Sequence, residues 1–252
     1  MSEPIQSVVL ALRILENLTN SGEEKGVTQL ARELGTTKAR VFRHLSTLRD
    51  RGYVIQNERT LKNRVGLRVY LLGRQVGEGI DVLQAVRPGM ERLRDRTGQT
   101  AVLAGVLDGR ATILDFRLGT DPIQIGLRPG TTFDLHASAL GRVLLAFGPP
   151  QTLERVLEGP FEKLTDHTNT DPATLQAQVA QVKKQGWSTA PEEAIVGLNA
   201  LAAPVFFHDG GLAGALAIVG PVRAVPGSDV HQLEELLHCS RSASRALGWR
   251  DG

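Results

Sequence analysis

One stretch, Val27–Val54, restricts the fold of this chain more than any other. Its pattern predicts two helices joined by a tight turn. Thr28 is placed to cap the first helix, and Gly35 suits the left-handed position that often ends one. Thr36 or Thr37 is placed to cap the second helix, because a threonine hydroxyl accepts a hydrogen bond from a free backbone N–H. This arrangement indicates a helix-turn-helix.

The second helix of the pair, which we expect to end near Asp50, separates into two faces. Val41, Leu45 and Leu48 share an apolar stripe that suits a core. The opposite side of the helix holds Ala39, Arg40, Arg43, Ser46 and Thr47, with Lys38 near the N-terminal end. No acidic residue occurs from position 36 to position 49, whereas a solvated helix usually carries both signs of charge.

The basic face has the chemistry of a nucleic-acid contact, because lysine and arginine bind phosphates and donate to base edges. It predicts that the helix enters the major groove of DNA. A solvated basic helix in another small bundle is the alternative. Residues 1–75 hold 13 Lys and Arg against 7 Asp and Glu, a net charge of +6, whereas residues 76–252 hold 16 against 20, a net charge of −4. This asymmetry indicates that only the N-terminal part contacts a polyanion.

The segments beside the helix pair complete a winged helix-turn-helix. Ser7–Thr19 has apolar residues at helical spacing and predicts a first helix. Tyr53–Gln56 and Arg64–Leu72 are expected to form two short strands around a polar tip, Asn57–Asn63. Basic side chains of this hairpin are placed to reach phosphate or the adjacent minor groove, namely Arg59, Lys62 and Arg64. A plain solvated hairpin is the alternative for these residues.

The next segment, Val69–Thr97, predicts mostly helix with one break. Proline suits the first turn of a helix and not its interior, so Pro88 is expected to begin a new helix that runs to Arg96. A shorter helix is expected around Asp81–Val86. We expect a stiff connector here, in contrast to a flexible linker rich in glycine and serine.

The remaining chain alternates strand and helix patterns. Asp108-Gly109 is a two-residue hairpin signal between segments rich in β-forming residues. The expected strands are Gln99–Leu107, Arg110–Leu118, Ile123–Arg128, Leu201–Phe207 and Leu212–Val219. The expected helices are Ser138–Phe147, Thr152–Leu157, Thr174–Gln185 and Asp229–Leu247. Hairpin-paired strands with helices between and after them predict an α+β fold, an antiparallel sheet with helices on its faces.

Composition narrows the class of protein further. The chain has 252 residues, long enough for two domains, and 41% of them are hydrophobic, which favours folded domains with sizeable cores over global disorder. Cys239 is the only cysteine, so neither an internal disulfide nor a cysteine metal cluster is possible, as suits a reducing cytoplasm. The sequence shows no signal-peptide pattern and no apolar run of membrane-spanning length. We expect a cytoplasmic protein with no membrane partner.

Six motifs follow one another along nearly the full length of the chain. They are L-S-T-L-R-D-R-G-Y-V, V-G-L-R-V-Y-L-L-G, V-R-P-G-M-E-R-L-R-D-R-T-G-Q-T-A-V-L, D-L-H-A-S-A-L-G-R-V-L-L-A-F, Q-G-W-S-T-A-P-E-E, and N-A-L-A-A-P-V-F followed by G-A-L-A-I-V-G-P. Each motif is weak alone. Together, in this order, they resemble the IclR family of bacterial transcriptional regulators.

The resemblance implies a winged helix-turn-helix domain (1–72), linker helices (73–97) and a GAF-like effector-binding domain (98–252). It implies a homodimer, with tetramers on DNA in some members. The partners it implies are double-stranded DNA, at a palindromic operator, and a small organic effector in the C-terminal domain. Such regulators usually repress transcription and are not enzymes, and no cofactor is implied.

The recognition helix departs from the family pattern. The family commonly has K-S-T-V-H-R-L-L where this chain has K-A-R-V-F-R-H-L at positions 38–45. Arg40 is able to donate to a guanine, whereas Ala39 is able only to touch a thymine methyl. We therefore expect an operator that differs from the usual family half-site. The predicted DNA-binding residues are Thr28, Thr37, Lys38, Ala39, Arg40, Arg43, Thr47, Arg59, Lys62 and Arg64.

The implied effector pocket also departs from the pattern. The family often has an acidic pair before Glu-Glu and an Arg-Cys pair before Leu-Ala-Ala-Pro, where this chain has Ala190-Pro191 and Asn199-Ala200. Asn199 offers both a donor and an acceptor. We expect a ligand larger or more neutral than a small keto acid, such as an aromatic one, or no ligand. The predicted lining residues are Ser138, Ala139, Leu140, Gly141, Glu192, Asn199 and Ala200. Ser138 opens a helix whose free amides suit an anion, or is an ordinary N-cap.

An enzyme is the main alternative function. The chain has hydrolase residue types in Asp134, His136, Ser138 and Glu192–Glu193, but A-S-A is not the G-x-S-x-G elbow. The six histidines lack i,i+4 pairing, so no metal site is expected. A protein-interaction module with a vestigial DNA-binding domain is a third possibility, and the basic helix face argues against it.

Overall fold

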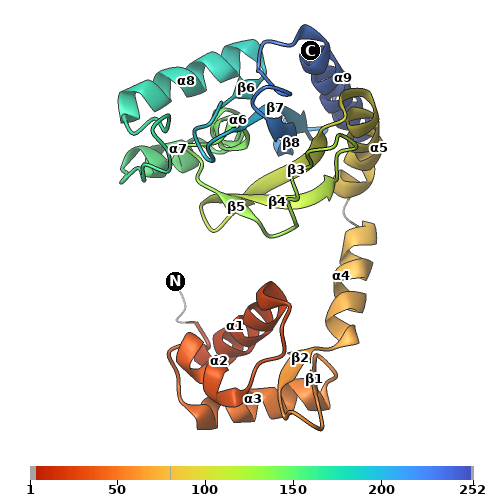
Figure 1. Ribbon diagram of the computed structural model, residues 1–252, viewed down its shortest axis with the longest axis vertical. Coiled ribbons are helices and arrows are strands. Elements are labelled where there is room, and N and C mark those ends of the chain that lie inside the picture. Colours follow the sequence, from red (N-terminus) through yellow and green to blue (C-terminus); the bar gives the residue numbers. More distant parts are fainter. Residues whose placement is uncertain (1–3, 80, 251–252) are drawn as a thin grey trace. The chain divides into compact units, whose positions relative to one another are not determined.

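The chain divides into two units, residues 1–79 and 80–252, of which the computed structural model describes residues 4–79 and 81–250. Figure 1 traces the elements of each unit in sequence colours. The segment 73–97, predicted as a linker, is divided between them, because one of its helices falls in each unit. Domain limits at residues 72 and 97 stay predictions.

The first unit is a winged helix-turn-helix, as predicted. Its elements are α1 (Gln6–Ser21), α2 (Val27–Glu33), α3 (Lys38–Asp50), β1 (Val54–Gln56), β2 (Asn63–Val65) and α4 (Leu67–Gly79). The two strands pair antiparallel, with Val54 opposite Val65. Ile14, Leu30 and Val41 are fully buried, so α1, α2 and α3 share one core.

Local residue chemistry sets the turn of the helix-turn-helix. Gly35 adopts the predicted left-handed conformation, with φ +63°. Thr37 caps α3, because its hydroxyl accepts a hydrogen bond from the backbone N–H of Arg40 at 3.3 Å. The predicted cap at Thr28 is wrong, since α2 begins two residues earlier, at Val27, and Gly26 occupies the cap position without a side-chain bond.

The predicted strand Arg64–Leu72 is also wrong beyond Val65. Gly66 ends the strand, and its backbone N–H donates to the carbonyl of Tyr53 at 2.8 Å. A Cβ at this position would lie 2.3 Å from the carbonyl oxygen of Gly52. The chain turns where only glycine fits, and the following apolar run forms α4. Short apolar runs of this kind suit either a strand or a helix.

The second unit is an antiparallel sheet with helices on both faces. Its elements are α5 (Asp81–Thr97), β3 (Thr100–Leu107), β4 (Arg110–Arg117), β5 (Thr132–Phe133), α6 (Ala139–Phe147), α7 (Pro150–Leu157), α8 (Pro172–Gln185), β6 (Ser188–Thr189), β7 (Leu198–Phe206), β8 (Leu212–Pro221) and α9 (Val230–Ala246). The strand order is β5-β4-β3-β8-β7-β6, and every described pair is antiparallel. The α+β prediction is confirmed.

Alternation along the central strands builds two cores, one on each face of this sheet. On β3, Val102 and Ala104 join the core beneath α6 and α8, whereas Ala101 and Leu103 join the core with α5 and α9. Figure 1 shows α6–α8 on one side of the sheet and α5 and α9 on the other. Because both faces are covered, the strands are almost continuously hydrophobic in sequence.

Two further expectations for this unit are wrong. Pro88 does not begin a helix but lies inside the continuous helix α5. Val86, Met90 and Leu93 around it are fully buried, so tertiary packing outweighs the local cost of the proline. The segment 123–128 is irregular, and the edge strand in this region is the shorter β5. Strand β6 was not predicted.

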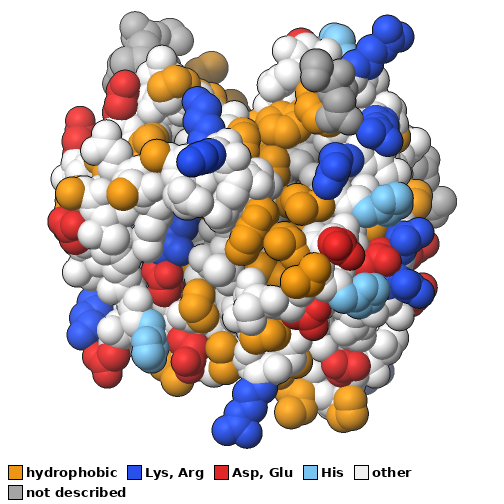
Figure 2. All heavy atoms as spheres, turned by 90° about the horizontal axis from the view of Figure 1, so that it is seen from above, with side chains coloured by type: hydrophobic (Ala, Val, Ile, Leu, Met, Phe, Trp, Pro, Cys, Tyr) orange, Lys and Arg blue, Asp and Glu red, His pale blue; other side chains and the backbone are white. Residues whose placement is uncertain are grey.

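Hydrophobic side chains also reach the surface. Figure 2 shows them gathered in a band across one face, with charged side chains at its edges. The exposed large hydrophobic residues of the second unit are Val106, Leu107, Leu114, Leu118, Ile123, Leu164, Ile195, Val196 and Val230. Exposed apolar surface of this kind suits contact with a partner. No helix within the described residues is long and apolar enough to span a membrane.

Candidate nucleic-acid interface and ligand pocket

The exposed side of α3 is the basic surface that the sequence predicts. Lys38, Ala39, Arg40, Arg43 and Thr47 are all exposed. Within the described part of the chain, the side chains of the three cations form no ion pair or hydrogen bond. The hydroxyl of Thr47 donates to the carbonyl of Arg43 at 3.2 Å. The unpaired cations leave this face of α3 with positive charge that only an external anion would neutralise.

An acidic residue outside the hairpin, Glu24, holds the wing against the rest of the first unit. The carboxylate of Glu24 accepts hydrogen bonds from Asn57 at 3.0 Å and from Thr60 at 3.3 Å. Glu24 also lies 3.7 Å from the guanidinium of Arg64, which is therefore partly neutralised. Arg59 and Lys62, at the tip, are exposed. The hairpin thus presents the two tip cations more freely than Arg64. The predicted DNA-binding residue Thr28, outside the hairpin, is exposed on α2.

A groove of about 990 Å³ lies between α1, α3 and α4 of the first unit. It is lined by Ser7, Val8, Ala11, Leu12, Leu15, Arg40, Arg43, His44, Thr47, Leu48, Tyr53, Val69, Leu72 and Gly73. Val8 and Leu12 are 52% and 53% exposed and lie next to one another on α1. The groove therefore has a mostly apolar wall on α1 and α4 and a polar, basic side on α3.

A cavity of about 50 Å³ lies in the second unit at the N-terminus of α6. It is lined by Ile125, Leu127, Phe133, Ala137, Ser138, Ala139, Leu140, Ala190, Ala194, Ile195, Leu198, Asn199, Ala200 and Val219. Five predicted residues are thus brought together here: Ser138, Ala139, Leu140, Asn199 and Ala200. None of the described lining residues carries a charge, so the cavity is neutral and mostly apolar.

The polar side chains of this cavity are engaged within the protein. Asn199 accepts hydrogen bonds from Thr189 Oγ1 at 3.0 Å and from its neighbour Ala200 N at 2.8 Å, and its Nδ2 donates to Val225 O at 2.8 Å. Ser138 caps α6 by accepting from Gly141 N at 3.0 Å and donates to Asp134 O at 2.9 Å. The backbone N–H groups of Ala139 and Leu140 make no hydrogen bond among the described residues and are free for a ligand.

Two predicted lining residues lie outside the cavity wall. Gly141 packs against the backbone, where a Cβ would meet the carbonyl oxygen of Leu135 at 2.2 Å. Glu192 adopts a left-handed conformation, with φ +58°, and its carboxylate accepts from Gly197 N at 2.8 Å. Glu192 therefore closes the 192–197 loop, which contributes Ala194 and Ile195 to the wall.

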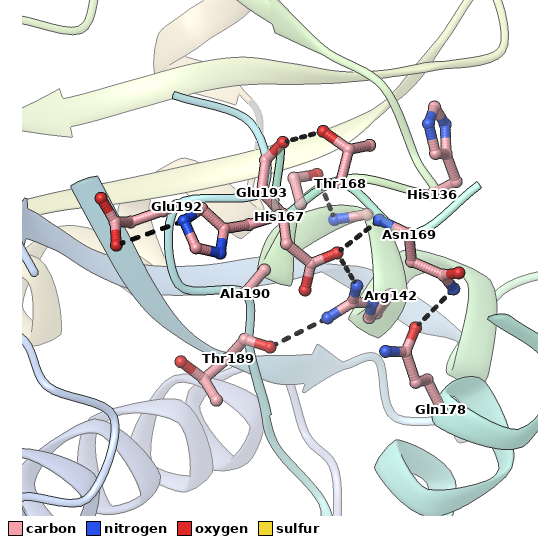
Figure 3. A network of polar contacts seen from close by, with 12 residues as sticks. His136, Arg142, His167, Thr168, Asn169, Gln178, Thr189, Ala190, Glu192 and Glu193 are labelled. Carbon is pink, nitrogen blue, oxygen red and sulfur yellow. Dashed lines mark hydrogen bonds and ion pairs between the residues drawn. The ribbon is translucent and has the colours of Figure 1, made fainter. Parts of the chain in front are cut away.

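A buried ion pair beside the cavity was not predicted. Arg142, which is 3% exposed, donates to the carboxylate of Glu193 and to the carbonyl of Thr189 at 3.0 Å. Thr168 Oγ1 donates to the carbonyl of Glu193 at 2.7 Å. Figure 3 shows how these residues connect α6 to the segment before β7. A lone arginine within the apolar sequence 139–147 was the available signal, because a buried cation requires a partner.

The hydrolase residue types do not form a catalytic set. His136 Nε2 bonds to the backbone carbonyl of Glu162 at 3.1 Å, and the ring stacks on Phe161. Asp134 pairs with Arg110 at 2.9 Å, and Ser138 donates to a backbone carbonyl. A serine nucleophile requires a hydrogen bond to a base, which Ser138 does not make. The described residues also contain no group of three or more side chains placed to hold a metal ion.

Comparison with known protein families gives two matches on this chain. Residues 7–58 match a family described as the IclR helix-turn-helix domain. Residues 74–245 match one described as the C-terminal part of the bacterial transcriptional regulator IclR. The chain is also 31% identical to the HTH-type transcriptional regulator XynR of Escherichia coli, across 97% of this chain and 98% of XynR.

Solved structures share the fold. An IclR transcriptional regulator from Alicyclobacillus acidocaldarius superposes with a TM-score of 0.87 at 24% identity, covering 98% of this chain and 99% of that one. An IclR homologue from Microbacterium hydrocarbonoxydans, complexed with 4-hydroxybenzoate, superposes with a TM-score of 0.86 at 22% identity, covering 96% and 98%.

Proposed function

The chain belongs to the IclR family of bacterial transcriptional regulators, and from this premise we propose that α3 and the wing tip carry its contacts with DNA. The observation that supports this assignment is the set of exposed, unpaired cations on a capped helix, Lys38, Arg40 and Arg43. Arg59 and Lys62 extend the positive surface at the wing. Phosphate contacts position such a domain on DNA, and side chains of the recognition helix select the sequence.

Fluorescence anisotropy with duplexes selected from genomic DNA tests this assignment. Arg43→Ala should weaken binding at least tenfold and reduce the salt dependence by about one phosphate contact. Arg13→Ala is the matched control, because Arg13 is an exposed arginine on α1 of the same unit and its loss changes the net charge equally. Equal losses in the two variants would mean that the effect is only one of net charge.

We propose that a second copy of the chain covers the α1 and α4 side of the groove between α1, α3 and α4 and leaves Arg40, Arg43 and Thr47 on α3 open to DNA. Val8 and Leu12 supply its apolar wall, and the exposed apolar residues of the second unit offer further contact area. A twofold dimer places two recognition helices on a palindromic operator. Leu12→Glu should abolish cooperative binding to a duplex with two half-sites and keep binding to one half-site. Unchanged cooperativity would place the dimer contacts elsewhere.

We propose that the cavity at α6 binds a small organic effector with an apolar body and a single polar group. The free N–H groups of Ala139 and Leu140 suit that polar group, and Leu127, Phe133 and Val219 suit the body. The Microbacterium homologue, complexed with 4-hydroxybenzoate, supports an aromatic acid. The cavity holds about 50 Å³, so binding has to move the wall formed by the 192–197 loop.

A thermal-shift screen tests the ligand class. Aromatic monocarboxylates should raise the melting temperature, and glyoxylate and pyruvate should not, because the two keto acids lack an apolar body to fill the apolar wall of the cavity. Strong stabilisation by either keto acid would contradict this proposal.

We further propose that the protein acts as a cytoplasmic repressor that its effector releases from DNA. Expression of a reporter gene under the selected operator should then increase when the gene for this protein is deleted and when the effector is added.

A further inference from the structure

Phe42 is an exposed aromatic residue on a helix that otherwise presents small, polar and basic side chains. Its side chain is 55% exposed, whereas Val41 and Leu45 beside it are fully buried. Phe42 is absent from the core of the first unit. A ring that is more than half exposed on the basic face of α3 is available for a contact outside the domain.

The position of Phe42 is fixed on the side of α3 toward the wing. The guanidinium of Arg49 lies over its ring, 5.8 Å from the centroid. Arg49 in turn donates to Gln56 on strand β1 at 2.5 Å. Arg40 and His44, in contrast, line the groove beside α1 on the other side of the helix. Phe42 therefore lies between the recognition helix and the wing, apart from the groove proposed as the dimer contact.

Base chemistry identifies what this ring would meet in the major groove. Thymine alone presents a methyl group there, and phenylalanine and alanine are side chains that contact it. Ala39 is exposed one turn before Phe42, so the two form a short apolar strip. Lys38 and Arg43 flank this strip with positive charge. We propose that Phe42, together with Ala39, selects operators that carry thymine at adjacent positions of each half-site.

This inference rests on the proposed entry of α3 into the major groove. A protein partner is the other surface that an exposed phenyl suits. The flanking cations and the absence of any acid from position 36 to position 49 favour a polyanion instead. The inference deepens the sequence preference predicted for Arg40, because it places an apolar contact on the opposite side of the helix.

Replacement of single thymines by deoxyuridine tests the proposal, since it removes the methyl group and keeps base pairing. The operator is first selected with the full-length protein from randomised duplexes. Each half-site thymine is then replaced in turn, and affinity is measured for the natural chain, Phe42→Ala, Phe42→Leu and Leu67→Ala. Leu67 is an exposed apolar residue of α4 and serves as the control.

For the natural chain, deoxyuridine at one or two adjacent positions should weaken binding about fourfold, the factor that follows from exposing one methyl group. Phe42→Ala should bind at least tenfold more weakly and no longer distinguish thymine from deoxyuridine at one of these positions, the one that Phe42 contacts, whereas Phe42→Leu and Leu67→Ala should still distinguish them at both. An unchanged response in Phe42→Ala would overturn the proposal while DNA binding stands. Loss of the dimer in Phe42→Ala would assign the ring to a protein contact and overturn it too. Absence of DNA binding by the natural chain would overturn the proposed function itself.

Discussion

The buried pair of Arg142 and Glu193 predicts a large loss of stability when either partner is replaced alone. Both side chains are almost fully buried, and Arg142 Nε has no hydrogen-bond partner among the described residues. Glu193→Leu would leave the guanidinium charge uncompensated in the interior. Arg142→Met would leave the carboxylate unpaired and the carbonyl of Thr189 without its donor. The pair therefore matters through the charge that each partner leaves behind.

The expected magnitude follows from measured losses of buried pairs. Removal of one partner costs about 3–5 kcal/mol. For a unit of this size each kcal/mol lowers the melting temperature by about 2–4 °C, so each single variant should melt about 6–20 °C lower. Apolar replacement of both partners is often neutral or stabilising. The double variant Arg142→Met, Glu193→Leu should therefore be more stable than either single variant.

Tryptophan fluorescence isolates this effect, because the only two tryptophans, Trp187 and Trp249, lie in the second unit. Thermal and urea unfolding followed at these residues report on the unit that contains the pair. Additive losses in the double variant, or a loss below about 1 kcal/mol in Glu193→Leu, would refute the reasoning. Either result would mean that solvent reaches the pair or that the interior relaxes around it.

Three further predictions concern other parts of the chain. Gly66→Ala should displace the wing and weaken DNA binding, because its Cβ would lie 2.3 Å from Gly52 O; unaltered affinity would contradict this. The hydrogen bonds from Lys25 and then Gln29 lower the pKa of Glu33 from 4.5 to about 2, so the stability that Glu33 contributes is present above pH 4.5 and lost as the pH falls toward 2. Fluorotyrosine NMR of Tyr53 and Tyr70, both in the first unit, should show that this unit loses stability as the pH falls, and Glu33→Gln should remove this pH dependence. Burial raises the pKa of Cys239 to about 11, so iodoacetamide at neutral pH should modify the thiol only after unfolding, as mass spectrometry would detect.

Helix periodicity and turn residues made the first unit predictable from sequence. Gly35 and Thr37 act locally, and each has the predicted role. The failures occurred where tertiary contacts decide. Gly66 ends β2 because the backbone of Gly52 is close in space, and Pro88 lies inside α5 because buried neighbours hold that helix. Neither contact leaves a local signal in the sequence.

The cavity was only partly predictable for a related reason. The N-terminus of α6 follows from the capping pattern at Ser138, and the family resemblance placed Asn199 beside it. The spacing of residues along the sequence gave no information on which polar side chains of the cavity form hydrogen bonds within the protein. Asn199 was expected to offer its amide to a ligand, and it instead holds Thr189 and Val225.

These internal bonds bear on how the cavity would select a ligand. Arg142 beside the cavity is neutralised by Glu193, and the Asn199 amide is occupied, so neither is free to recognise a charged group. The remaining donors are uncharged backbone N–H groups at the start of α6. Shape and apolar contact should therefore dominate affinity, and isothermal titration should give nearly equal dissociation constants at low and high salt. A steep salt dependence would mean that the Arg142–Glu193 pair opens on binding and presents its guanidinium to the ligand.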